Sequence, residues 1–454
     1  MGHERRMGRS ASALAGIGLG LALSLGAAGA EEGEGEPDPA AGPQLDWSVE
    51  AKLHYRDSDE EVFPIRILAL PPELQNQALT TVDPGSHLEL STVTIYLDAE
   101  WGETLAAHLK VDFIDLYDRN PTSTDKELDV DEAWLRFGRE AEPALVPEDA
   151  GIYLKLGKFP KFERQDDRHL ESYGLVSTAF NRFEDVGVEI GADLGRHLFV
   201  KASATQGNPV FMRDPNALAG DNGLRDEILG LRDPELGSGI VIPYDADGED
   251  LDTDGDVQLG AAAGFRLGAA GGENGFELLA FGRRRDLAET VELEGTIYGG
   301  DLDLLNGPGD AFPFPLTGDQ KEEVGASAWL YLGGFTLFAQ FVDQDLGGLE
   351  RTGAEAEAAW RFELPVGAAI GGRQLFPYIQ PGARWSRLDP DFLPPAGTPT
   401  PSFAWEWEKL DLGLRLGIVR GVDLTIEHAA HTITLVSGAE RSNDELLATF
   451  RWRT

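Results

Sequence analysis

Long runs of strict alternation between apolar and polar residues fill this chain from Leu45 to its end. In the first run, apolar side chains occupy every odd position from Leu45 to Tyr55, and polar side chains occupy the even positions between them. Successive side chains of a β-strand point to opposite faces, so the run predicts a strand with one apolar and one polar face. Soluble strands are typically about 5–6 residues long, whereas a strand that crosses a bilayer needs about 9–11. The length of the run favours a membrane-spanning strand.

The same alternation recurs along the chain and predicts sixteen strands in all. They cover 45–55, 93–101, 105–113, 133–137, 152–159, 184–194, 198–204, 257–267, 276–280, 324–332, 335–341, 354–364, 375–385, 410–418, 422–435 and 446–452. A single-chain bacterial outer-membrane barrel requires an even number of antiparallel strands. We therefore expect an all-β fold, a 16-stranded antiparallel transmembrane β-barrel over residues 44–454.

The links between the predicted strands support this fold. Links after even-numbered strands are mostly short, and links after odd-numbered strands are mostly long, as at 56–87, 160–183 and 207–255. Short periplasmic turns and long extracellular loops are typical of outer-membrane barrels. Aromatic residues near strand ends, such as Trp47 and Trp452, fit the belts found at membrane interfaces, although core aromatics are the alternative.

The N-terminal region has the features of an export signal. Residues 1–30 begin with Arg5, Arg6 and Arg9, continue with an apolar run, and end in small residues near Ala30. This pattern predicts a signal peptide cleaved near Ala30 and a mature protein in the bacterial outer membrane, with an uncleaved anchor as the alternative. Residues 31–43 form a flexible acidic leader, and no later apolar run is long enough for a transmembrane helix.

Charge and composition exclude several kinds of partner and site. The net charge of −41 speaks against a nucleic-acid partner, because phosphate contacts need clustered Lys and Arg. Such acidity suggests a salt-adapted surface or a vestibule that attracts cations. With no cysteine, the chain has no disulfide and no thiolate metal site, and we expect no cofactor.

The polar face of each strand is expected to line a water-filled interior. Unpaired backbone groups are too costly in lipid, so the sheet must close, and sixteen strands enclose a channel. Outer-membrane lipid and small hydrophilic solutes or ions are then the partners. The strand pattern places these charged residues on the pore wall: Lys52, Lys110, Lys155, Lys201, Arg266, Arg283, Glu355, Glu357 and Arg361.

The link at 160–183 is the third long connection from the N-terminus. It is too polar to be part of a hydrophobic core and too rich in large side chains to be only a flexible linker. In water-filled porins this loop folds inward and sets the narrowest point, where charged groups determine ion preference. The predicted constriction residues are Lys161, Glu163, Arg164, Asp166, Asp167, Arg168, Glu171 and Arg182.

A family resemblance rests on the residues around this link. The run Lys-Leu-Gly-Lys-Phe at 155–159, then Phe-Asn-Arg at 180–182 and Glu-Asp-Val-Gly-Val at 184–188, resembles the phosphate-selective porin O and P family. The sequence departs from that family at Pro160-Lys161-Phe162, where the family has Pro-Phe. The resemblance implies a porin that assembles as a homotrimer and carries anions such as phosphate.

Other candidate sites leave two further functions open. Asp250, Asp252 and Asp254 have the spacing of a calcium loop, but Ala261 stands where the bidentate glutamate belongs. The sequence therefore favours a solvated acidic loop and no metal site, with loose binding of divalent cations as the alternative. The leading hypothesis is a passive diffusion channel without enzymatic activity. The alternatives are a non-transport barrel with an adhesive or cation-binding outer surface, and a barrel-borne hydrolase, which would need a nucleophile–base pair.

Overall fold

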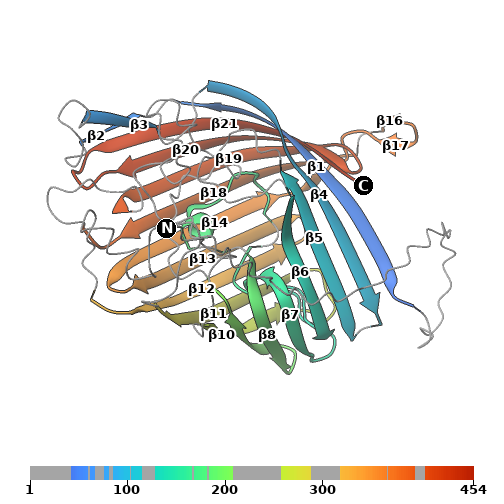
Figure 1. Ribbon diagram of the computed structural model, residues 1–454. Coiled ribbons are helices and arrows are strands. Elements are labelled where there is room, and N and C mark those ends of the chain that lie inside the picture. Colours follow the sequence, from blue (N-terminus) through green and yellow to red (C-terminus); the bar gives the residue numbers. More distant parts are fainter. Residues whose placement is uncertain are drawn as a thin grey trace, which may run out of the picture. The chain divides into compact units, whose positions relative to one another are not determined.

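The computed structural model describes most of the chain after residue 41 (Figure 1). The described residues are 42–59, 62–66, 76–80, 85–102, 104–114, 128–165, 168–180, 182, 184–207, 257–287, 317–365, 367–393 and 404–454. The predicted signal peptide, most of the predicted acidic leader and the aspartates Asp250, Asp252 and Asp254 lie outside these residues.

One antiparallel sheet closes on itself to form the barrel. Its strands are β1 (Gln44–Ser58), β4 (Gly85–Trp101), β5 (Leu105–Ile114), β6 (Leu128–Gly138), β7 (Ile152–Pro160), β8 (Glu184–Leu194), β9 (Leu198–Thr205), β10 (Gln258–Gly268), β11 (Gly275–Asp286), β12 (Gln320–Leu332), β13 (Phe335–Leu346), β14 (Leu349–Trp360), β15 (Phe362–Glu363), β18 (Tyr378–Pro390), β19 (Glu406–Val419), β20 (Val422–Thr434) and β21 (Glu440–Arg453). β1 pairs with both β4 and β21, and Figure 1 shows it beside β21. β14 and β15 both pair with β18 and follow one another along it, so they count as one strand of the barrel. The barrel therefore has sixteen strands, as predicted.

Three small elements were not predicted. A hairpin joins β2 (Val62–Arg66) to β3 (Asn76–Thr80), and another joins β16 (Ala369–Ile370) to β17 (Arg373–Gln374). The helix α1 (Leu175–Ala179) lies in the long link after β7. The described residues contain no helix with the length and hydropathy of a membrane span.

The outward face of the sheet is apolar and exposed. Leu97, Leu135, Phe341 and Leu412 are 45%, 45%, 51% and 51% exposed, respectively. Between such residues, most inward side chains are polar or charged and mostly buried, and buried apolar side chains such as Phe281, Trp329 and Phe338 lie among them. A closed barrel with this distribution satisfies its backbone hydrogen bonds internally and presents hydrocarbon to lipid.

Two strands extend further than their predicted starts because each contains a β-bulge. In β4 the pairing partners move from Thr92 to Leu90, which leaves Ser91 as an extra residue. In β6 they move from Glu132 to Val130, which leaves Asp131 as the extra residue. A bulge of one residue shifts the outward positions from even to odd numbers. The regular alternation therefore predicted only the part of each strand after the bulge.

Candidate functional site

The long link after β7 folds into the barrel. We call residues 161–183 the inner loop, of which Asp166, Asp167, Asn181 and Phe183 lie outside the described residues. Its helix α1 packs on β14, β18 and β19, with Leu175 and Ala179 fully buried. The inward-folded third loop is confirmed.

The base of the inner loop is held by a group of buried ion pairs. Both carboxylate oxygens of Glu163 accept hydrogen bonds from Arg283 of β11, at 2.8 and 2.7 Å. Arg182, at the other end of the loop, reaches Glu163 at 3.2 Å and Glu323 of β12 at 2.7 Å. Burial alone would raise the pKa of Glu163, but Arg283 and Arg182 outweigh it and lower the pKa to about 2. Glu163 is therefore a charged anchor.

Glu171 anchors the middle of the inner loop across to other strands. It pairs with Lys52 of β1 at 3.1 Å and with Arg415 of β19 at 2.9 Å. Burial opposes the charge of Glu171, but Lys52 and Arg415 outweigh it and hold its pKa well below the usual range. Its backbone N–H donates to Glu427 of β20 at 2.9 Å. This single residue thus ties the loop to β1, β19 and β20, and Arg451 of β21 lies 4.0 Å from its carboxylate.

The tip of the inner loop rests on a buried charged cluster. Arg384 of β18 donates to Ser172 at 2.5 Å and pairs with Asp411 at 2.9 Å and Glu357 at 3.2 Å. Lys409 of β19 donates to the backbone carbonyl of Tyr173 at 2.6 Å. Charge-assisted hydrogen bonds are the stronger kind, so this wall of the barrel and the loop form one packed body.

The predicted constriction residues divide into two groups. Lys161, Glu163, Glu171 and Arg182 are buried in the loop-to-wall contacts. Two others are partly exposed: Arg164 pairs with Glu184, and Arg168 stacks over the Tyr173 ring at 3.8 Å. Asp166 and Asp167 fall outside the described residues. The role of all eight predicted constriction residues in ion passage stays a prediction.

The predicted wall residues also divide by what covers them. Arg283, Glu355 and Glu357 lie beneath the inner loop and are buried, so they do not border open space as the strand pattern implied. Lys155, Lys201 and Arg266 are covered from another side, by the strap described below or by neighbouring carboxylates. Lys52 and Lys110 stay partly accessible.

Arg361 differs from the other eight predicted wall residues. It lies in the break between β14 and β15, where its exposed side chain pairs with Glu363 at 2.7 Å and covers the Tyr378 ring at 3.8 Å. Arg361 therefore belongs to the end of the barrel and not to the wall of its spanning part. The alternation counted it as inward because it cannot detect the end of the sheet.

A second inward segment was missed by sequence reasoning. We call residues 139–150, the link between β6 and β7, the strap. Ala144 and Val146 of the strap are buried, and the Ala144 N–H donates to Glu277 of β11 at 3.0 Å. Val146 forms a β-bridge with Ala270 in the turn after β10. The length of this link among short turns was the only signal in the sequence.

Glu140 fixes the start of the strap to the wall. It pairs with Lys155 of β7 at 2.8 Å and with Lys201 of β9 at 3.0 Å. Burial alone would raise the pKa of Glu140, but the two ammonium groups lower it below its usual range. The strap thus closes off the inner face of β7 to β9.

Two parts of the inner surface contrast as a result. We call the inner faces of β11–β14 and β18–β20 the covered wall, since the inner loop lies on them. Its side chains Glu357, Arg384 and Asp411 are 0% exposed. We call the inner faces of β4, β5 and β6 the open wall. The ion-paired side chains of β5 and β6 on the open wall are 13–24% exposed: His108, Lys110, Asp112, Asp129, Asp131, Glu132 and Arg136.

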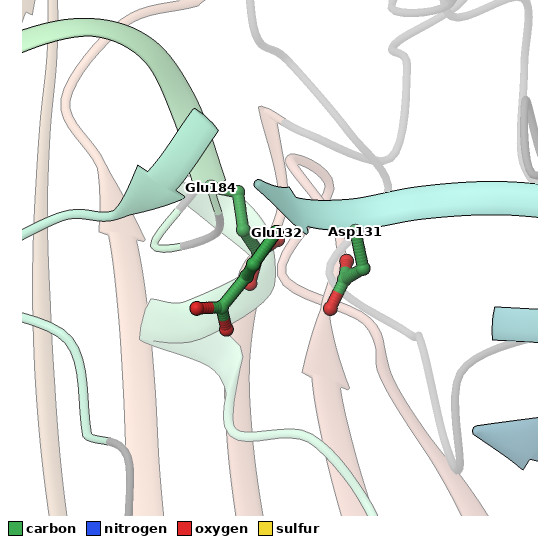
Figure 2. Close-up of side chains that lie close together, drawn as sticks. All are labelled: Asp131, Glu132 and Glu184. Atoms are coloured by element: carbon green, nitrogen blue, oxygen red, sulfur yellow. The ribbon is translucent and has the colours of Figure 1, made fainter. Parts of the chain in front are cut away.

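An acidic group lies on the open wall next to β8. Figure 2 shows Asp131, Glu132 and Glu184, whose carboxylate oxygens lie within 4.8 Å of one another. Asp131 and Glu132 both face inward because Asp131 is the bulge residue. Lys110 pairs with Asp131, and Arg164 pairs with Glu184. The chain itself therefore compensates most of this negative charge.

A cavity of 540 Å³ opens at the end of the open wall beside the strap. It is bordered by the β4–β5 turn, the end of β6, the strap and the β10–β11 turn. Ala106 and Arg136, both on the inner face, belong to its lining. Its charged lining residues are Glu100, Glu140, Glu142, Glu148, Glu273, Arg136 and Arg139.

Comparison with family models gives no match, and comparison with curated proteins gives none either. Similar solved structures include the outer membrane channel DcaP of Acinetobacter baumannii, with 10% identity, 91% of this chain and 98% of that chain covered, and a TM-score of 0.48. Salmonella typhi OmpF in complex with daunomycin has 9% identity, coverages of 91% and 98%, and a TM-score of 0.47. Pseudomonas putida OprB at high pH has 11% identity, coverages of 90% and 94%, and a TM-score of 0.46. The phosphate-selective family that residues 155–159 resemble is not confirmed, so function is argued from this chain's own residues.

Proposed function

We propose that this protein is an outer-membrane porin, a channel for passive diffusion of small hydrophilic solutes or ions. One observation carries the proposal: a closed sixteen-stranded barrel with an apolar outer face and a charged inner face, part of which stays accessible. A buried, unpaired charge is costly. Buried interior charges such as Arg384 are paired, and the partly exposed charged side chains of β5 and β6 are best explained by water inside the barrel.

The inner loop narrows this passage without filling it. Its anchors lie on the covered wall, whereas the side chains of the open wall remain accessible beside it. A passage with charged sides and a limited radius selects by size and charge. It carries out no covalent chemistry.

The finer hypothesis of an anion channel for phosphate rests on the sequence resemblance. Many inward arginines are held by carboxylates: Arg283 by Glu163, and Arg384 by Asp411 and Glu357. A guanidinium that is bound in this way offers little positive potential to a passing phosphate. The geometry supports a general diffusion channel better than a phosphate-selective one.

Conductance in planar bilayers tests the proposal. Purified mature protein is expected to give step-like ionic currents, and reversal potentials in asymmetric salt then give the sign of selectivity. A folded, inserted but silent barrel would favour the non-transport alternative with an adhesive or cation-binding surface. Hydrolysis of peptide or phospholipid substrates in detergent would favour the enzyme alternative.

The homotrimer implied by the resemblance is a separate proposal. Crosslinking in native membranes and the mass of the detergent complex measure it. A monomer would leave the channel proposal intact, because the passage described above lies within one chain.

A further inference from the structure

The accessible part of the inner surface forms a continuous column. On β5 the inward residues His108, Lys110 and Asp112 are partly exposed, and Ala106 at the end of this row is 8% exposed. On β6 the column runs from Asp129 to Arg136. Inward residues of β18 and β19, such as Ser386 and Asp411, are fully buried under the inner loop. The described inward side chains are therefore partly exposed on β5 and β6 and fully buried at Asp411 and Ser386.

The column leads into the cavity beside the strap. Ala106 on β5 and Arg136 on β6 are members of both. The strap separates this exit from the inner faces of β7 to β9, where Glu140 is tied to Lys155 and Lys201. The cavity thus lies at this end of the open wall, beside the strap.

The lining of this exit carries a surplus of negative charge. Five glutamates and two arginines border the cavity. Lys155 and Lys201 compensate Glu140, whereas Glu142, Glu148 and Glu273 are exposed. Leu145 and Pro147 form an apolar part of the lining. A cleft with one dominant sign of charge concentrates counter-ions.

We propose that solutes cross this barrel off its axis, along the open wall of β4, β5 and β6, and that the cavity beside the strap makes the channel favour cations. This inference rests on the proposed function and names its route and its class of solute. The cations it fits are small, either inorganic ions or organic ammonium compounds with a short apolar stem.

The chain has no cysteine, so single thiols can report on the route. Ala106→Cys places a thiol in the cavity, and Ser386→Cys places one on the covered wall, where Ser386 is 0% exposed. Both are small changes to inward residues and form a matched pair. Should Ala106→Cys fail to fold, Ala141→Cys on the strap lines the same cavity.

A cationic methanethiosulfonate reagent is expected to reduce the current through Ala106→Cys and to leave that through Ser386→Cys unchanged. Reduction through Ser386→Cys alone, or equally through both, overturns the off-axis route. If neither variant nor the native protein conducts, the proposed function itself fails, which is a different outcome.

The charge preference has its own readout in the same protein. The cationic reagent should modify Ala106→Cys about tenfold faster than its anionic counterpart, after correction for their rates with a free thiol. Glu142→Gln combined with Glu148→Gln should bring this ratio toward one and shift the reversal potential toward anions. Equal rates for both reagents, or a native reversal potential of anion selectivity, overturn the cation preference.

Discussion

The covered wall and the open wall are both built from strands with alternating side chains, yet their charged side chains differ in their partners and in their exposure. On the covered wall, many charged side chains have partners in the inner loop or in the next strand, as Arg384 has in Ser172 and Asp411. On the open wall, the charged side chains pair among themselves and remain partly hydrated, as Lys110 does with Asp131. The sheet provides the cylinder, and the inner loop decides which part of it is left to solutes.

The largest expected effect on conductance comes from removing the inner loop, which lies on the covered wall. Deletion of residues 163–178 should raise single-channel conductance severalfold, because the inner loop occupies space beside the open wall. The measurement is conductance in planar bilayers, with heat-modifiable migration in gels as the control for a folded barrel. Unchanged conductance in a folded variant would mean that the loop does not limit the passage.

A smaller increase is expected from breaking one anchor. Glu163→Gln removes the carboxylate that binds Arg283 and leaves Arg182 with the carboxylate of Glu323 alone. Breaking a buried ion pair costs about 3–5 kcal/mol. The loop base should loosen, with a noisier and larger current than the native one. Glu322→Gln is the matched control, since Glu322 lies beside Glu323 on β12 and is 56% exposed. Equal currents in both variants would contradict the anchoring role.

Acid should act through the same anchor. The pKa of Glu163 is lowered from 4.5 to about 2, so its contribution to loop docking is complete above pH 4.5 and is lost as the pH falls toward 2. Conductance is expected to stay constant between pH 7 and 4.5 with respect to this anchor and to rise below that. A loop that detaches near neutral pH would contradict this order.

The smallest effect concerns Lys161 at the loop base. Burial lowers its pKa to about 8, with Arg283 and Arg182 adding to the effect and Asp185 opposing it. Raising the pH from 7 to 9 therefore removes one positive charge from the lumen. The reversal potential should move toward cations with a midpoint near pH 8. Lys161→Gln should lack this step, and a step that persists in the variant would assign it to another group.

The barrel could be predicted from the sequence because it depends on patterns within each strand and on pairing between strands that are neighbours along the chain. Alternation fixes which face of a strand meets lipid, and each strand pairs with its neighbour along the chain. The prediction failed where local order fails: at Ser91 and Asp131, where bulges shift the alternation, and at Arg361, where the strand ends.

The division between the two walls could not be predicted from the same pattern. Glu171 meets Lys52, 119 positions away, and Ser172 meets Glu427, 255 positions away. Such partners are brought together only by closure of the barrel. The strap was missed for the same reason, because Ala144 is buried against Glu277 of a distant strand.

Swelling of proteoliposomes in isosmotic solutions of uncharged solutes tests the central claim most directly, since it requires a water-filled passage and no charge selectivity. Liposomes with the inserted protein are expected to swell in a small pentose, and more slowly as the solute becomes larger. Swelling no faster than in protein-free liposomes, with the barrel shown to be folded and inserted, would contradict the account.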